Sequence, residues 1–118
     1  MAKSKHNNVK VEVEGIKFDS KLEARYYEQV KWLKATGGIL SFRLQPRYLL
    51  QDSFRKDGVL HRKIHYVADF EITHLDKTIE VIDVKGQILP VFALKLKMFH
   101  KLYPHKLSLI TYSVMDGG

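Results

Sequence analysis

The chain has 118 residues, of which 45% are hydrophobic, so it has room for one packed domain and little more. It contains no cysteine, which excludes disulfides, thiolate zinc sites and cysteine nucleophiles. Twenty Lys and Arg against thirteen Asp and Glu give a net charge of +7, which suits a polyanionic partner but also an ordinary soluble basic protein.

We do not expect the amino-terminal residues to act as a signal peptide. Residues 1–10 are basic and polar and lack the apolar core of a signal peptide. No apolar run approaches the roughly 20 residues of a membrane span. We therefore expect a cytoplasmic protein without a membrane partner, in which residues 1–8 form a flexible basic terminus and residues 9–118 form a single domain.

The first predicted elements are a short β-hairpin and a helix. Valines alternate with charged residues over 9–13, and Glu14-Gly15 turns the chain into residues 16–18, which predicts the hairpin. Ser20 and Glu23 fit a helix capping box, and apolar residues follow at helical spacing. Gly37-Gly38 is expected to end this helix.

The later elements give a mixed αβ pattern. In chain order we expect a β-rich stretch over 39–50 broken by Pro46, a turn at Asp57-Gly58, a strand over 64–72 with one apolar face, a turn at 74–77, a strand over 78–85, a helix over 91–103 ended by Pro104, and a strand over 107–112. The order is β-β-α-β-β-β-α-β. We expect an α/β (α+β) fold in which two helices flank a mixed central sheet, with the strands around Asp69 and Asp83 at its centre.

The strand over 78–85 carries the first candidate for chemistry. Asp83 and Lys85 leave the same face, which they share with Val81, and a charge on a buried face needs a partner or a metal. Asp69 should lie opposite Asp83 on the neighbouring strand. Two adjacent carboxylates repel unless a cation joins them, and Mg²⁺ suits two carboxylates, waters and a phosphate oxygen best. Taken alone, however, an Asp-x-Lys pair is more often a surface ion pair.

Two further charged residues fall on apolar helix faces. Glu23 lies inside the apolar sector of the first helix, so it either points at the sheet or caps the helix together with Ser20. Lys95 lies near the middle of the apolar arc of the second helix. It either extends its ammonium past the helix to solvent or reaches the same polar pocket, where it could hold a phosphate.

With Glu23, Asp69 and Asp83-Val84-Lys85 in view, the chain resembles the PD-(D/E)XK nuclease superfamily over roughly residues 15–112. Ala68 stands where the motif has proline. A phage and prophage branch of that superfamily, similar to Holliday-junction resolvases, is indicated by the phrases GIKFDSKLEARYY, LQPRYLL, YVADFEI and VIDVKG. The resemblance implies a restriction-endonuclease-like core with the hairpin added at its amino end.

The resemblance also implies roles for residues. Asp69, Asp83 and the backbone carbonyl of Val84 would bind Mg²⁺, with Mn²⁺ able to substitute. Glu23 would bind a second metal or a metal-bound water, and Lys85 would be the catalytic lysine. Gln45 and Glu71 are weaker candidates near the site. A basic strip for the DNA backbone is formed by His61, Arg62, Lys63 and His65, with Lys95 beside it, although any one of these could simply belong to a solvated face.

The function implied is a Mg²⁺-dependent DNA endonuclease. Branched or junction DNA is the expected substrate, in phage recombination, replication or packaging within a bacterial host cell. Cutting both strands of a junction would need a symmetric homodimer. Two alternatives remain: a nuclease acting on flap, nicked or plain duplex DNA, and a non-catalytic nucleic-acid-binding protein on the same fold.

Overall fold

The computed structural model describes residues 10–111. Val9 of the expected hairpin, Tyr112 of the expected last strand and the expected flexible segment 1–8 lie outside these residues. The elements are β1 Val11–Val13, β2 Ile16–Phe18, α1 Lys21–Ala35, β3 Ser41–Leu44, β4 Arg47–Gln51, β5 Phe54–Lys56, β6 Val59–His61, β7 Ile64–Val67, β8 Phe70–Thr73, β9 Ile79–Lys85, α2 Pro90–Leu102 and β10 Lys106–Thr111.

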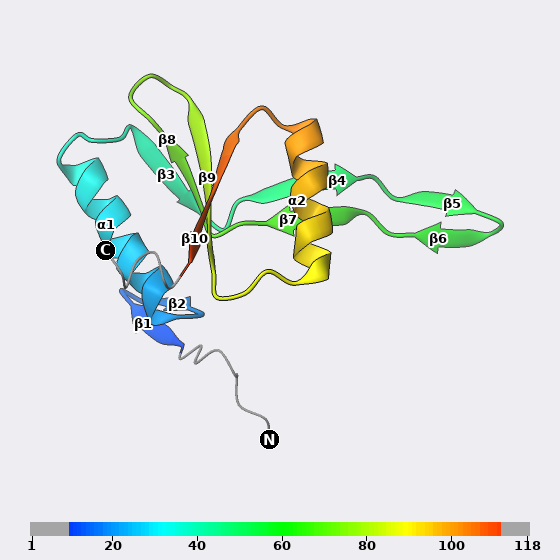
Figure 1. Ribbon diagram of the computed structural model, residues 1–118, viewed down its shortest axis with the longest axis horizontal. Helices are drawn as coiled ribbons and strands as arrows, with labels where there is room; N and C mark the ends of the chain where they lie inside the picture. Colours follow the sequence, from blue (N-terminus) through cyan, green and yellow to red (C-terminus); the bar gives the residue numbers. More distant parts are fainter. Residues whose placement is uncertain (1–9, 112–118) are drawn as a thin grey trace.

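The central element is a four-stranded mixed sheet in the order β10-β9-β8-β3. β10 runs parallel to β9, while β9 with β8 and β8 with β3 are antiparallel. The predicted mixed sheet with two helices and an added hairpin is confirmed at this level. The hairpin β1–β2 packs beside α1, whereas α2 contacts β4 and β7 (Figure 1).

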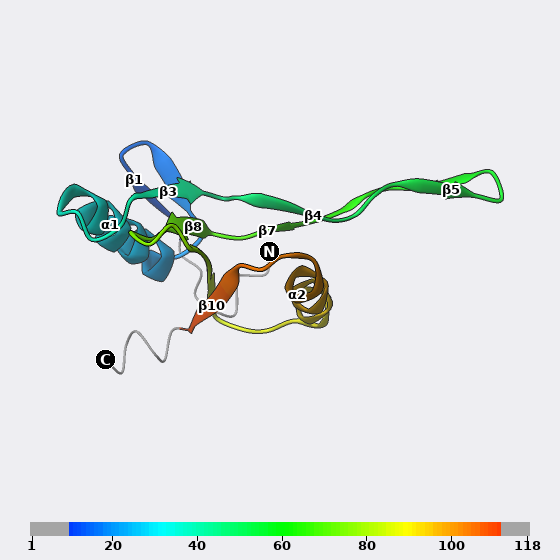
Figure 2. The same ribbon diagram turned by 90° about the horizontal axis from the view of Figure 1, so that it is seen from above.

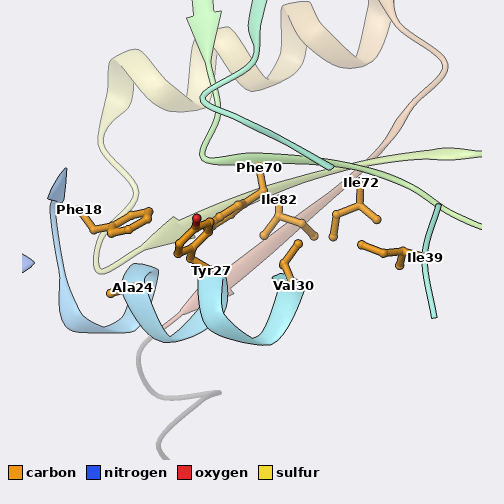
Figure 3. Close-up of a cluster of buried hydrophobic side chains, with 8 residues drawn as sticks. All are labelled: Phe18, Ala24, Tyr27, Val30, Ile39, Phe70, Ile72 and Ile82. Carbon is orange, nitrogen blue, oxygen red and sulfur yellow. The ribbon is translucent and has the colours of Figure 1, made fainter. Parts of the chain in front are cut away.

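The two helices cover opposite faces of β9, because neighbouring residues of a strand point to opposite sides. Ile82 belongs to a buried cluster with Val30 and Tyr27 of α1 (Figure 3). Val81 belongs to a second cluster, which includes Phe92 and Phe99 of α2. Burial of both faces explains why β9 contains three consecutive buried residues, Val81, Ile82 and Asp83.

The ends of α1 follow from local sequence. The Ser20 side chain accepts a hydrogen bond from the Glu23 backbone N–H at 3.1 Å, which caps the amino end. At the other end Gly37 adopts a φ of 84°, and the Gly38 N–H donates to the Leu33 carbonyl at 2.7 Å. Neither helix described in residues 10–111 is long and apolar enough to cross a membrane.

The expected single strand over 64–72 is wrong, because the chain changes sides at Ala68-Asp69. Tyr66 packs in the cluster beneath α2, whereas Phe70 packs in the cluster beneath α1. β7 pairs with β4, while β8 pairs with β3 and β9, so the two halves belong to different ladders. Alternation of apolar residues cannot reveal a change of partner.

The β-rich stretch over 39–50 is divided in the same way. Gln45 adopts a φ of 50° and Pro46 follows it, which separates β3 from β4. With the extra hairpin β5–β6, the described residues contain ten strands instead of the six expected.

A long β-ribbon is the other feature that the predicted element order lacked. The β4–β7 pair leads into β5–β6, which projects away from the body of the molecule (Figures 1 and 2). Asp57 and Gly58 at its tip have φ values of 52° and 76°, as in the two-residue hairpin turns that match strand twist. The predicted turn at Asp57-Gly58 is confirmed, and we call residues 51–63 the arm.

Candidate active site

Asp69 lies at the break between β7 and β8, and its backbone is held on both sides. Its N–H donates to the Ile82 carbonyl at 3.1 Å, and its carbonyl accepts from the Gln45 N–H at 2.9 Å. The side chain accepts a hydrogen bond from the Val84 N–H through Oδ2 at 2.7 Å. These bonds fix the Asp69 carboxyl beside the carboxyl end of β9, next to Asp83.

Asp83 is 2% exposed, which is unusual for a carboxyl group. Its Oδ2 accepts a hydrogen bond from the Tyr66 hydroxyl. Its Oδ1 lies 3.4 Å from the Lys85 Nζ, and that ammonium sits 4.4 Å from the centre of the Phe92 ring. Asp83 and Lys85 are therefore not a surface ion pair, because the carboxylate is buried and the ammonium is held over a core aromatic ring.

Glu23 is 6% exposed and points inward from the first turn of α1. Its carboxyl group accepts a hydrogen bond from the Asp19 backbone N–H and interacts with the Asp69 carboxyl, and it also faces the charge of Asp83. The two interpretations of Glu23 are thus compatible. Its backbone takes part in the helix cap, while its side chain joins Asp69 and Asp83.

Burial raises the pKa values of all three carboxyl groups. Burial, then the charges of Asp83 and Glu23, raise the pKa of Asp69 to about 8. Burial raises the pKa of Glu23, and the neighbouring charges of Asp19 and Asp83 raise it further. Burial also raises the pKa of Asp83, against the opposing effects of Tyr66 and Lys85. At neutral pH the cluster therefore holds a proton or needs a cation in its place.

The donor set fits a hard cation. Carboxylate oxygens are what Mg²⁺ prefers, and it commonly takes one or two carboxylates and completes its shell with water and substrate oxygens. Asp69, at the break between β7 and β8, and Asp83 on β9 provide such a pair, with Glu23 beside them. Among residues 10–111, no group of three or more Asp, Glu, His or Cys side chains is placed so that it could hold a metal ion by itself. The chemistry thus fits an open site in which solvent and phosphate supply most of the ligands.

The raised pKa of Asp69 makes the stability of the metal-free protein depend on pH. Its pKa rises from 3.8 to about 8 in the folded state, so the proton favours the folded state and this stabilisation is lost as pH rises toward 8. We expect the free energy of unfolding to fall by at least ~1.4 kcal/mol, the worth of one pKa unit, between about pH 6.5 and 8.5.

Urea unfolding in chelator at a series of pH values measures this slope. Asp69→Asn should flatten it, and Mn²⁺ should raise the stability of the parent more at pH 8.5 than at pH 6.5. Equal slopes for the parent and Asp69→Asn would show that the proton is not held at Asp69.

The weaker candidates occupy other positions. Glu71 receives two hydrogen bonds from Arg43, each of 2.9 Å, and one from the Tyr48 hydroxyl at 2.6 Å. The Arg43 guanidinium lowers the pKa of Glu71, so this carboxylate is ionised and already paired. Gln45 adjoins Asp69 through its backbone N–H, while its side-chain position is exposed.

The basic candidates follow the ribbon. His61, Arg62 and Lys63 are exposed at the base of the arm, and His65 is half-buried on β7. Partial burial lowers the pKa of His65, and the positive charges of Arg47, Lys63 and Lys95 lower it further. Lys95 is half-buried on α2 and close enough to β7 for its charge to act on His65, and its role stays a prediction.

Two site residues were missed in the sequence. Tyr66 was assigned only to an apolar strand face, although a buried tyrosine hydroxyl needs a hydrogen-bond partner and could have been matched to Asp83. Phe92 was assigned only to the apolar arc of the second helix, and nothing in its spacing indicated a contact with Lys85.

A family model described as "Protein of unknown function (DUF1064)" matches residues 3–115. Comparison with curated proteins gave no match. This family description assigns no activity.

Proposed function

The chain belongs to the family described as protein of unknown function (DUF1064), and we propose from the chemistry of its carboxyl cluster that it is a divalent-metal-dependent DNA endonuclease. The observation that supports the proposal is the carboxyl pair of half-buried Asp69 and buried Asp83, with the Lys85 ammonium 3.4 Å from Asp83. Holding like charges together away from water costs free energy. A carboxyl pair that is kept beside a lysine therefore indicates a ligand site.

The residues would divide the work of phosphodiester hydrolysis as follows. Asp69 and Asp83 would hold the cation, Glu23 would bind a water on it or a second ion, and the Val84 carbonyl is a further ligand implied by the PD-(D/E)XK resemblance. When bound, such a cation supplies a water of lowered pKa and neutralises charge on the scissile phosphate.

Lys85 and Tyr66 would act beside the cation. The Lys85 ammonium can orient the attacking water or stabilise the negative charge that grows on the phosphate in the transition state. Tyr66 fixes one oxygen of Asp83 through its hydroxyl, and burial together with the charge of Asp83 raises its pKa, so it remains a proton donor in that bond.

DNA is proposed as the polymer because of the net charge of +7 and the cations along β7 and the arm. Branched or junction DNA is the preferred substrate that the resemblance implies, within phage recombination, replication or packaging in the bacterial cytoplasm. Paired cuts at a junction would require a symmetric homodimer.

The test compares cleavage of four-way junction, flap, nicked, duplex and single-stranded DNA with Mg²⁺ and with chelator. We expect Mg²⁺-dependent cutting, fastest on the junction, to leave 5′-phosphate and 3′-hydroxyl ends. Faster cutting of flap or nicked DNA would retain the nuclease and change its substrate. Binding of all these DNAs without cleavage under any divalent cation would favour the non-catalytic alternative.

A further inference from the structure

The arm is the least explained part of the molecule. Every residue from 51 to 63 is exposed, and the arm projects clear of both helices in two views (Figures 1 and 2). A two-stranded hairpin alone is only marginally stable in water. Yet it leaves three large apolar side chains close to half exposed, Phe54 at 45%, Val59 at 54% and Leu60 at 48%. Such a surface is incomplete without a partner.

The composition of the arm favours a polyanionic partner. Residues 54–63 contain four Lys and Arg against one Asp. In the β5–β6 register Phe54 faces His61, and their rings stack at 4.8 Å with an angle of 15°. Lys56 follows on the same face, and Arg55 lies on the opposite face, so both faces carry a cation beside an apolar side chain. Two arms pairing with each other would bring these like charges together.

The arm is also continuous with the candidate active site. β7 leaves the base of the arm and carries His65, around which Arg47, Lys63 and Lys95 gather. The next residue, Tyr66, donates to Asp83. Positive charge therefore extends from the arm to β7, the strand that also carries Tyr66.

We propose that the arm enters the major groove of duplex DNA beside the point of cleavage, an inference that rests on the proposed function for the identity of the polymer. A two-stranded β-ribbon fits the major groove of B-DNA, whereas the deep, narrow major groove of duplex RNA does not admit it. The Arg55 and Lys56 side chains reach phosphates, and Phe54 and Leu60 lie against the groove.

The length of the ribbon sets how much duplex is needed. Tyr48 pairs with Tyr66 at the site, and the tip lies at Asp57-Gly58. Nine residues of strand span about 30 Å, which corresponds to about nine base pairs. Substrates whose duplex beside the point of cleavage is shorter than this should lose the arm's contribution to binding affinity.

The test measures binding of a duplex of about 30 base pairs in the Asp83→Asn background, so that cleavage plays no part. Adding Arg55→Glu and Lys56→Glu should weaken binding at least ~10-fold and reduce the slope of log affinity against log salt by about two. Lys17→Glu with Lys77→Glu is the matched control, because it removes the same charge from exposed positions away from the arm and should change affinity less than ~2-fold. Duplex RNA of equal length should bind more weakly and respond equally to both double variants.

The outcomes separate the two proposals. If the arm variant binds DNA as the control does, the arm inference is overturned and the nuclease proposal is untouched. If the arm variant is monomeric in sedimentation while the parent and control are dimeric, the arm contacts a second copy instead and the inference also fails. If DNA binding depends on the arm but the unsubstituted protein, which retains Asp83, never cuts DNA, the nuclease proposal fails and the arm inference stands.

Discussion

Replacing Asp83 by Asn should reduce DNA cleavage at least ~10³-fold, because the change removes a charged ligand worth several kcal/mol in the transition state while keeping its shape. The same variant should be at least as stable as the parent in chelator. Burial raises the pKa of Asp83, so the folded protein gains nothing from the ionised form when no cation is present. Cleavage rates and urea unfolding curves measure the two effects.

Glu71→Gln provides the matched control for Asp83→Asn. Glu71 is another carboxylate of the sheet, but it is paired with Arg43 and Tyr48, and its pKa is lowered by Arg43. This variant should cut DNA within ~3-fold of the parent and lose about 1 kcal/mol of stability, the worth of one such pairing. Asp83→Asn is thus expected to lose activity and keep stability, whereas Glu71→Gln is expected to keep activity and lose stability. An Asp83→Asn protein that cuts as fast as Glu71→Gln would remove the basis for the assignment.

Replacing Lys85 by Met should reduce cleavage ~10²–10³-fold, the usual worth of one group that stabilises charge in the transition state. Met keeps an unbranched side chain against Phe92, so the fold should be retained and the loss can be attributed to the ammonium. Single-turnover cleavage measures the rate, and DNA binding should change little, since Lys85 would act on the scissile phosphate alone.

Lys97→Met is the control for the loss of one positive charge. Lys97 is exposed on α2, so its removal lowers the net charge equally but leaves the carboxyl cluster intact. We expect its cleavage rate to stay within ~2-fold of the parent. Equal losses in both variants would mean that Lys85 contributes only to the general attraction of DNA.

Much of the fold could be predicted from local signals. Ser20 and Gly37 mark the ends of α1 because caps are short-range chemistry. The parity of β9 predicted that Asp83 and Lys85 share a face, and the connection through residues 74–77 predicted that Asp69 lies beside Asp83. These predictions hold because strand period and turn length are fixed by the backbone.

The rest depends on pairing between distant segments. The change of side at Ala68-Asp69 arises because β7 pairs with β4 while β8 pairs with β9. The sequence of residues 64–72 contains no signal that predicts this pairing. The same change of side turns Tyr66 toward Asp83 and gives Asp69 its fixed backbone. Glu71 could not be separated from the site, because its partner Arg43 lies in a strand 28 positions earlier in the chain.

The projecting arm was missed for a related reason. The sequence predicted a turn at Asp57-Gly58. The hairpin around it is exposed, however, so it lacks the uniformly apolar face by which a strand is recognised in a sequence. Its exposed residues resemble those of a loop.

The proposed nuclease activity requires a hard cation in the space between Asp69 and Asp83. A crystal grown with Mn²⁺ and examined by anomalous scattering tests this directly. We expect one Mn²⁺ within about 2.5 Å of a carboxylate oxygen from each aspartate, with the Tyr66 hydroxyl still on Asp83. The same crystals of Asp69→Asn should lose that peak. A fully ordered site in which Asp69 and Asp83 share only a proton, with no anomalous signal at saturating Mn²⁺, would contradict the account.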